Sequence, residues 1–407
     1  ARGLMERTGT RSIRISGVEV LLPAAPGRRP TALEIAEIDL ARSGPGEITV
    51  TGEVTLDGQA AALKANASVV NGVTSALSAT LTGMEMTPFL LRRADDGAPR
   101  DGVQGTVDLD LSAVRAREST KPAITATLRQ SPGLFYFDGV AQQLSGGSIH
   151  AAYDFSRNSL ELLPSEIRFG PTVLPFVGAV IDLNRLDASD TRPGFGLNIL
   201  ISGARAEAEG SGEAPAIFDL RAGGRYLSVE RELQVDDMLV SSPLGSMAGS
   251  LRVHFGDESP EISFGAQLPT MQVTGVKQLW PFWMARKARD WVLENMFGGT
   301  VTEGSIAVFI PAGRMRGPDH PMELDANELQ IAFNIDNARM NLPGEIPPLR
   351  DLKGRFDLRG ELMNVNVEKA NSYFPSGRVV DVRTSQFTIP STYAKPLMGD
   401  LKLSVSG

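Results

Sequence analysis

The amino-acid sequence predicts an all-β protein: a long, twisted, mostly antiparallel and repetitive sheet, curled into an open hydrophobic groove, with one amphipathic helix near residues 281–297. Three observations lead to this fold class. One strand pattern recurs along the chain, 42 glycines and 26 prolines separate many short segments, and only one segment has an extended helical pattern. Short strands divided by many turn residues are typical of all-β architectures.

The recurring pattern starts with glycine and a polar residue, after which apolar and polar residues alternate. Its copies are at residues 52–56, 105–111, 249–255, 304–308, 354–358 and 399–405. Alternation with a period of two gives a strand one apolar face and one polar face. Repetition along the chain predicts a sheet assembled from similar units.

Short turns connect several of these strands. Asp57 with Gly58, and residues 157–159, are typical of hairpin turns. Strands joined so closely must be antiparallel, because parallel strands need a long crossover connection.

Two similar segments, 84–88 and 271–274, lead into helical sequence. In the first segment, Thr87 followed by proline predicts a helix N-cap and a proline at the first helical position. The second leads to the only substantial helix, which we predict at residues 281–297. The glycines at 298–299 are expected to end it as a left-handed cap.

This predicted helix has two possible roles. All three tryptophans of the chain lie in it or beside it, and one side of it carries large apolar side chains at helical spacing. It either braces the apolar face of the sheet or forms an amphipathic gate at the groove edge, with Lys277, Arg286 and Arg289 near lipid phosphates. The residues assigned to this gate or brace are Trp280, Trp283, Met284 and Trp291.

We expect one continuous architecture that is truncated at both ends. Residues 1–270 form a repetitive β-groove segment, residues 271–300 a helix-containing insertion, and residues 301–407 continue the groove. The chain starts at Ala1 and stops inside the last copy of the strand pattern, so we expect it to be a piece of a longer protein. Its longest apolar run, residues 174–181, is too short to cross a bilayer.

Composition and spacing argue against several classes of function. The net charge of −8 and the absence of a basic stripe disfavour a nucleic-acid partner. The chain has no cysteine, which excludes disulfides and thiolate metal sites and suits an oxidising compartment such as the periplasm. His150, His254 and His320 are far apart and lack metal-ligand spacing, and no two carboxylates form a convincing acid–base pair. We therefore predict no enzyme activity, no metal and no cofactor.

The predicted strands present more apolar surface than one helix of roughly 25 Å can cover. The sheet can pack on itself as a sandwich, coil into a closed solenoid, or form an open trough covered by something other than protein. Periodicity alone favours the closed forms, because sandwich packing is the commoner solution. The aliphatic lining, in a chain with only 6% aromatic residues, suits acyl chains, and each buried methylene contributes about 0.8 kcal/mol.

A family resemblance adds to this pattern. The segment 279–295 reads LWPFWMARKARDWVLEN and continues as MFGGTVTEG to Gly304. Together with the repeated alternating strands, it resembles the YhdP-type branch of the AsmA-like family, whose relatives include AsmA and TamB. Members share a tryptophan–proline and Ala-Arg-x-Trp helix that runs into a glycine-led strand.

The resemblance implies a periplasmic bridge, anchored in the inner membrane by an N-terminal helix that this chain lacks. Such proteins form a long β-groove with a hydrophobic interior, similar to eukaryotic bridge-like lipid-transfer proteins. The implied function is phospholipid transport between the inner and outer membranes, and the implied partners are phospholipid and both membranes or their proteins. The residues that we expect to line the groove are Val54, Leu56, Val107, Leu109, Leu111, Leu251, Val253, Phe255, Phe356, Leu358, Leu401, Leu403 and Val405.

Two other functions are open at this point. The first is a secreted structural or adhesive β-repeat protein with a closed core and no lipid. The second is a carbohydrate-active β-solenoid enzyme, which is disfavoured because glycoside hydrolysis needs two carboxylates that flank the bond.

Overall fold

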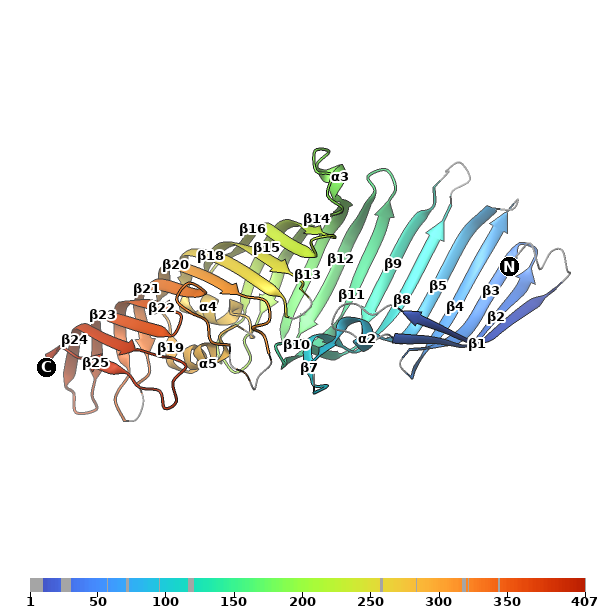
Figure 1. The fold of residues 1–407 in the computed structure, drawn as a ribbon. Coiled ribbons are helices and arrows are strands. Elements are labelled where there is room, and N and C mark those ends of the chain that lie inside the picture. The colour runs from blue at the N-terminus through green and yellow to red at the C-terminus, as the bar shows by residue number, and fades with distance from the viewer. Residues whose placement is uncertain are drawn as a thin grey trace. The chain divides into compact units, whose positions relative to one another are not determined.

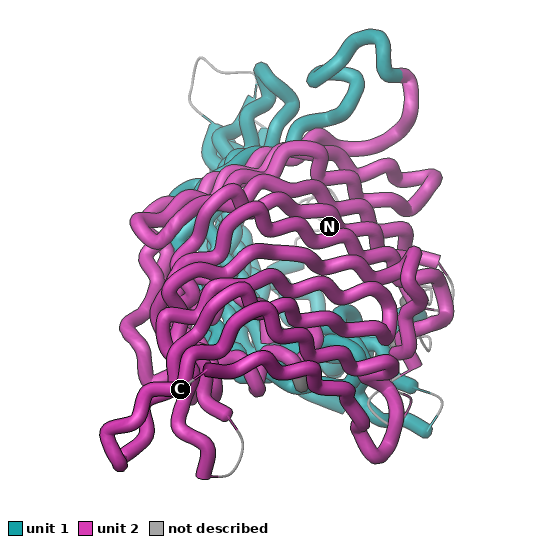
Figure 2. The backbone as a smooth tube through the Cα atoms, turned by 90° about the vertical axis from the view of Figure 1, so that its left-hand side faces the viewer, with its two compact units in different colours: residues 1–170, 175–190 teal, residues 171–174, 191–407 magenta. Residues whose placement is uncertain are grey.

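The computed structural model confirms the all-β class and the antiparallel pairing. It contains 67% strand and 7% helix and has one long antiparallel sheet that is not closed into a barrel. Contacts divide the chain into two compact units, unit 1 (residues 1–170 and 175–190) and unit 2 (residues 171–174 and 191–407), which Figure 2 shows in two colours. The structure describes residues 10–22, 31–56, 58–70, 73–94, 96–115, 121–256, 259–282, 284–316, 320, 322–342 and 345–406.

Unit 1 consists almost entirely of strands (Figure 1). In chain order its elements are β1 (Ser12–Leu22), β2 (Thr31–Gly44), β3 (Glu47–Leu56), β4 (Gln59–Val70), β5 (Val73–Glu85), α2 (Thr87–Leu90), β6 (Arg92–Arg93), β7 (Pro99–Gln104), β8 (Thr106–Val114), β9 (Ala123–Gln130), β10 (Gly133–Phe137), β11 (Val140–Asp154), β12 (Ser159–Phe169), most of β13 (Thr172–Asp182) and α3 (Leu183–Leu186).

Both predicted hairpin turns are confirmed. Leu56 pairs with Gln59, so only two residues separate β3 from β4; Asp57 itself lies outside the described residues. In the second turn Asp154 pairs with Ser159, and the turn residue Asn158 has a φ of 55°. Asparagine tolerates this left-handed conformation better than most side chains do.

Unit 2 continues the strand-by-strand arrangement and contains the longer helices. Its elements are β14 (Gly194–Ala206), β15 (Ala216–Leu227), β16 (Glu232–Ser242), β17 (Gly245–His254), β18 (Glu261–Gln272), α4 (Val273–Leu279), α5 (Arg286–Asn295), β19 (Met296–Phe297), β20 (Thr300–Ile310), β21 (Leu329–Met340), β22 (Leu349–Arg359), β23 (Leu362–Tyr373), β24 (Val379–Ile389), β25 (Asp400–Lys402) and β26 (Val405–Ser406).

Four of the six glycines that open the recurring pattern lie inside strands, at or beside bulges of the sheet, whereas Gly105 and Gly399 lie just before β8 and β25. Gly52 pairs with Ile38, next to a register shift between Ile35 and Glu37, and a Cβ atom there would be 2.4 Å from the Glu37 carbonyl oxygen. Gly354 lies at a register shift of its own strand, and a Cβ atom there would be 2.4 Å from the Asn366 carbonyl oxygen. Bulges bring neighbouring backbones unusually close and bend the strand. At these positions the glycine of the recurring pattern therefore marks a bend in the strand.

Of the helix predicted at 281–297, only residues 286–295 are helical, as α5, and a separate helix, α4, ends before the predicted range at Leu279. Trp280 ends α4 in an extended conformation with φ −71° and ψ 116°. The break between the two helices is expected physically, because the residue before a proline is disfavoured in the helical region, and Pro281 follows. The second helix, α5, starts only at Arg286, after Ala285 in a left-handed conformation.

The C-terminal end of this helix also differs from the prediction. α5 ends at Asn295, and Met296–Phe297 form the short strand β19, which pairs with β21. Gly298 and Gly299 have φ values of 59° and 76°. They therefore form the turn from β19 to β20 and do not cap the helix. None of the helices among the described residues is long and apolar enough to span a membrane.

The short helix predicted after residue 86 is present as α2. Its N-cap is Met86, without a side-chain hydrogen bond, so the prediction of Thr87 as the cap is wrong by one residue. The Thr87 hydroxyl and its backbone N–H instead donate to the carboxylate of Glu85. The expected proline is present within the first turn.

Candidate functional site

Unit 1 has one face formed by uninterrupted rows of apolar side chains. Because cross-strand partners share a face, the strand registers can be followed from one strand to the next. The first row crosses nine strands through Ile13, Leu40, Val50, Ala65, Ala79, Leu111, Ala126, Ala151 and Leu162. The second row runs beside it through Ile15, Ile38, Gly52, Leu63, Leu81, Leu109, Leu128 and Ile149. We call these two rows the apolar face of unit 1.

The opposite face of the same strands is polar. A matching row there runs through Arg14, Asp39, Thr51, Lys64, Thr80, Asp110, Thr127 and His150. Ion pairs form across neighbouring strands, with 2.8 Å from Arg14 Nε to Asp39 Oδ1 and 2.5 Å from Arg129 Nη1 to Asp110 Oδ2. The hydrogen bonds from these guanidinium groups lower the pKa of Asp39 and of Asp110. The charged and polar side chains of this face are well solvated by water.

The apolar face of unit 1 is only partly buried. In its first row Ala151 is buried and the other members are half-buried, and in the second row Ile15 is 40% exposed. The three buried hydrophobic clusters formed by the described residues all belong to unit 2. The helix α2 packs against β7, which lies outside these rows. No described part of the chain therefore packs as a layer over these apolar rows.

Unit 2 also has an apolar face, and one of its rows crosses eight strands. This row passes through Met238, Gly249, Ala266, Ile306, Ile331, Leu358, Met363 and Ile389. Another passes through Phe333, Phe356, Val365, Phe387 and Leu401. The aromatic rings of Phe333 and Phe356 are stacked, with centroids 4.8 Å apart.

In unit 2 the helices cover part of this face. We call α4 and α5 the helix module. Val273 and Val276 of α4 and Val292 of α5 belong to one cluster with buried strand residues. Those strand residues are Val301, Ile335, Ala338, Leu349, Leu352, Val367, Ala370 and Val382. Leu279, at the end of α4, packs on two further clusters that involve β14 to β18.

A buried polar joint holds the helix module in place. Lys277 of α4 is fully buried and forms an ion pair with Glu213, and its Nζ donates to the Met296 carbonyl oxygen at 2.9 Å. The ammonium also lies 4.4 Å from the ring centroid of Phe297. The neighbouring Gln278 donates to Ser211 Oγ at 3.0 Å. A buried lysine needs such partners, because an unpaired charge is costly to remove from water.

The structure places most of the predicted groove residues on the two apolar faces, but Phe255 and Leu403 lie outside the strands. In unit 1, Val54 pairs with Ile35 and with Ala61, beside the apolar rows, and Leu109 and Leu111 are members of those rows. Leu56 and Val107 lie on the same face but are buried.

In unit 2 the same placement holds, with different degrees of burial. Leu251 pairs with Phe264, and Phe356, Leu358 and Leu401 are in the rows described above. Val253 is buried, whereas Leu401, Leu403 and Val405 are more than half exposed, and Phe255 is exposed beside Tyr226. That any of these side chains binds lipid stays a prediction.

The tryptophan positions do not form one side of a continuous helix, because of the break at 280–285. Trp280 Nε1 donates to the Met284 carbonyl oxygen at 2.8 Å, within the break. Trp291 lies on α5 with 48% of its surface exposed, and Trp283 lies outside the described residues. Because of the break, Trp280 and Trp291 do not lie on one side of a single helix, although the sequence predicts that they do.

The basic residues expected near lipid phosphates are mostly engaged elsewhere. Lys277 is bound by Glu213 and by the Met296 carbonyl oxygen, and no local sequence signal could have revealed the carboxylate partner 64 positions away. Arg289 donates to the Trp280 carbonyl oxygen at 3.1 Å, and burial lowers the pKa of its guanidinium, while Asp290 acts in the opposite direction. Arg286 alone of the three has a largely exposed side chain.

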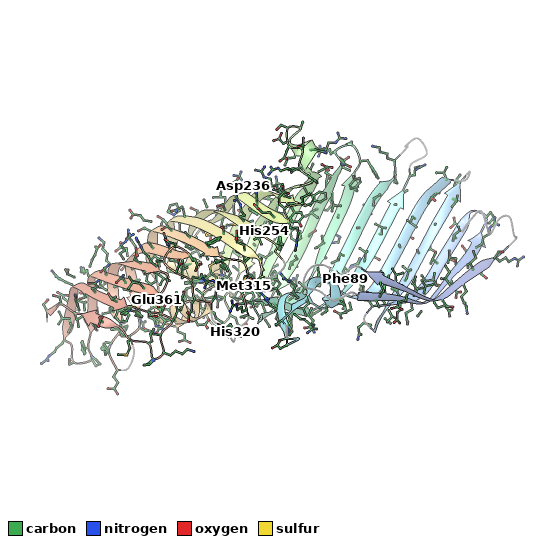
Figure 3. All side chains as sticks on the ribbon, viewed as in Figure 1. Phe89, Asp236, His254, Met315, His320 and Glu361 are labelled. Atoms are coloured by element: carbon green, nitrogen blue, oxygen red, sulfur yellow. The ribbon has the colours of Figure 1, made fainter. Side chains whose placement is uncertain are left out.

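No candidate metal site is found in the part of the chain that the structure describes. Groups of three or more His, Asp or Glu side chains that could hold a metal ion are absent there. His150 Nδ1 lies 3.1 Å from Thr127 Oγ1 on the polar face. His254, at the end of β17, and His320, in the connection after β20, are labelled in Figure 3 and come from different elements.

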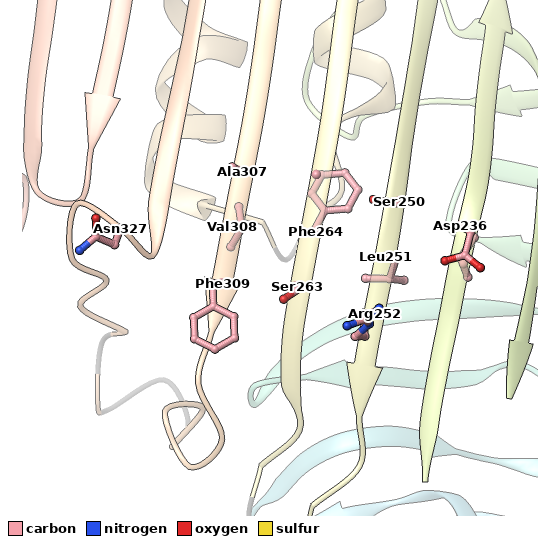
Figure 4. A pocket seen from close by; sticks show the side chains of 12 residues that line it. Asp236, Ser250, Leu251, Arg252, Ser263, Phe264, Ala307, Val308, Phe309 and Asn327 are labelled. Atoms are coloured by element: carbon pink, nitrogen blue, oxygen red, sulfur yellow. The ribbon is translucent and has the colours of Figure 1, made fainter. Parts of the chain in front are cut away.

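A shallow hollow of about 320 Å³ lies over β16, β17, β18 and β20 (Figure 4). The two charged side chains that line it already have partners. Asp236 pairs with Arg225 at 3.2 Å, and Arg252 with Glu232 at 3.1 Å. Neither charged side chain of the hollow is therefore left without a partner, and the apolar faces remain the candidate functional surface.

The comparison of this chain with protein-family models, curated proteins and solved structures finds no match.

Proposed function

We propose that this chain is a segment of a periplasmic bridge-like lipid-transfer protein, which holds phospholipid acyl chains in a hydrophobic β-groove during transport between the inner and outer membranes. The observation that carries the proposal is the apolar face of unit 1. Its first row crosses nine strands without a polar side chain. An exposed apolar surface of this extent marks either a binding surface or an aggregation hazard.

The chemistry of this face suits acyl chains better than a ligand with polar groups. Its side chains are aliphatic and offer neither a hydrogen-bond donor nor a charge. Each methylene that leaves water gains about 0.8 kcal/mol wherever it lies on such a surface. A ligand held only in this way has nearly the same energy at successive positions along the rows. Holding lipid without fixing it in place is what a transport surface requires.

A closed β-repeat protein without lipid would bury these rows against a second layer. In a sandwich the inner faces of two sheets interdigitate into a dry core about 10 Å thick. The half-buried state of Val50, Leu109 and Leu111 favours lipid over such a core.

Purification without detergent tests the proposal. The whole chain is analysed by native mass spectrometry, and its solvent extract is analysed for phospholipid. We expect bound phospholipid that survives purification. A protein that is folded, monomeric and free of lipid, even after incubation with phospholipid vesicles, would contradict the proposal and favour the adhesive alternative.

Two neighbouring residues of β8 provide a matched pair of variants. Leu111 lies on the apolar face, and Ser112 lies on the polar face, where it pairs with Ser78 and Thr125. Leu111→Glu places a charge among the acyl chains and is expected to remove most of the bound phospholipid. Ser112→Glu adds the same charge to the same strand and is expected to leave lipid binding unchanged. Circular dichroism of both variants checks that the strands are still formed.

A further inference from the structure

We infer that the helix module restricts lipid in unit 2 to a narrow strip of the apolar face, so that unit 2 holds fewer acyl chains side by side than unit 1 does. This inference rests on the proposed function. It adds that the helix module sets the width of the surface on which lipid lies in unit 2. The strip consists of apolar side chains that the module leaves half-buried: Leu251, Phe264, Val308, Phe333, Phe356, Val365 and Phe387.

The boundary of the strip runs along the same register on successive strands. On β22, Leu352 is only 3% exposed and belongs to the cluster under the helix module, whereas Phe356 and Leu358 are half-buried. On β23 the change occurs between Val367, which is in the cluster, and Val365, which packs at its margin. β22 and β23 are thus each divided into a covered part and an accessible part.

The accessible width differs clearly between the two units. On β3 of unit 1, the half-buried apolar positions extend from Ile48 to Val54, which is about 20 Å at the usual rise per strand residue. On β22 of unit 2 they extend only from Phe356 to Leu358, about 7 Å by the same measure. Several acyl chains fit abreast in the first width, but only one fits in the second.

The lining of the strip differs as well. Four of its seven members are phenylalanines, whereas the two rows that define the apolar face of unit 1 contain no aromatic residue. Phenylalanine rings turn about fewer bonds than acyl chains and pack in preferred geometries, as the stacked pair Phe333–Phe356 does. The strip therefore offers mostly aromatic rings, whereas the rows of unit 1 offer only aliphatic side chains.

The module is fixed strongly enough to act as a boundary. Lys277 is bound by the Glu213 carboxylate and the Met296 carbonyl oxygen, and Gln278 Oε1 accepts from the Ala208 backbone N–H at 2.5 Å. Lifting α4 from the sheet would leave the Lys277 charge without these partners and expose the cluster around Val273 and Leu352. Lipid is therefore expected to pass beside the module and not beneath it.

Photo-leucine, a diazirine analogue of nearly the same shape as leucine, tests this inference without a disruptive substitution. The full chain is produced with photo-leucine at all leucines, incubated with vesicles of phosphatidylethanolamine and phosphatidylglycerol, irradiated and digested. Mass spectrometry then locates the leucines that carry a lipid adduct. The covered residues Leu349 and Leu352, the strip residue Leu358, and Leu111 of unit 1 are all read in one sample.

We expect adducts at Leu111 and Leu358 and none at Leu349 and Leu352. Adducts at Leu352 equal to those at Leu358 would overturn the inference, because lipid would then reach beneath the helix module. Adducts at Leu111 without any at Leu358 would also overturn it, since unit 2 would hold no lipid, while the proposed function would stand for unit 1. If all four leucines lack adducts, the proposed function fails together with the inference.

Discussion

Each unit contains a pair of neighbouring strands that are joined by an inserted segment. In unit 1, β5 pairs with β8, and the insertion between them holds α2, β6 and β7. In unit 2, β18 pairs with β20, and the insertion holds α4, α5 and β19. In both insertions the last short strand pairs with a later strand, β7 with β10 and β19 with β21.

The two insertions have different consequences for the apolar face beside them. The four residues of α2 pack against β7, and most members of the apolar rows of unit 1 stay half-buried. The helix module of unit 2 instead contributes Val273, Val276 and Val292 to a packed cluster. The strand pattern thus produces an apolar face in both units. The inserted helices decide whether that face becomes a core or an accessible surface.

The largest effect is expected from breaking the joint that holds the helix module. Glu213→Ala leaves the buried Lys277 ammonium without its carboxylate, and loss of one partner of a buried pair typically costs about 3–5 kcal/mol of the free energy of unfolding. Urea unfolding followed by tryptophan fluorescence measures this in unit 2, because all three tryptophans lie at residues 280–291.

The exposed ion pair between Arg221 and Asp237 provides the control. Asp237→Asn is expected to change the same free energy by less than about 1 kcal/mol. The double variant Lys277→Met with Glu213→Leu removes both charges and is expected to recover most of the stability. Equal effects of Glu213→Ala and Asp237→Asn would show that the joint does not hold the module.

An intermediate effect is expected from the same substitution made on the two apolar faces. Leu352→Ala leaves a cavity in the cluster under the module and is expected to cost about 2–5 kcal/mol. Leu111→Ala removes a side chain that is already half in water, so we expect a cost of about 1 kcal/mol. Hydrogen exchange of peptides from β22 and β8 measures the two changes separately.

Added phospholipid provides a further test of the difference between β8 and β22. Incubation with phospholipid is expected to slow exchange in β8 and to leave the covered end of β22 unchanged. If Leu111→Ala is as costly as Leu352→Ala in the absence of lipid, the apolar face of unit 1 is packed against something, and the difference between the units disappears.

The smallest effect is expected from the polar face of unit 1 and depends on pH. The hydrogen bond from Arg129 lowers the pKa of Asp110 below its ordinary value of 3.8. The folded state therefore gains stability from this carboxylate at pH values above about 4, and loses it as the pH falls through the lowered pKa. Thermal melting between pH 6 and pH 2.5 should show a slightly steeper loss for the wild type than for Asp110→Asn. Identical slopes would indicate that this ion pair adds nothing to the stability of unit 1.

The strands and their two faces could be predicted because the signal for them is local. In the segment 105–111, residues Val107, Leu109 and Leu111 alternate with Thr106, Asp108 and Asp110, and the structure places the two sets on opposite faces. Turn residues such as Gly58 and Asn158 fix the antiparallel neighbours in the same local way.

The tryptophan segment shows where the sequence pattern was misleading. Its apolar residues have helical spacing through 280–291, but the proline at 281 forces Trp280 out of the helical region, and the spacing across that point has no meaning. The pattern gave no warning that Lys277, which was expected near lipid phosphates, is the most deeply buried charge in the helix module.

The sequence by itself determined that this protein forms strands, where several of the turns between them lie, and which side of each strand is apolar. These properties depend on residues within a few positions of one another and on the steric demands of glycine and proline. Only the tertiary structure decided which apolar rows are covered and which are left accessible. Burial depends on side chains that are distant in the sequence, such as Lys277 with Glu213 or Val273 with Val382, and a strand pattern of period two is the same whether its apolar face meets a helix, another sheet or a lipid.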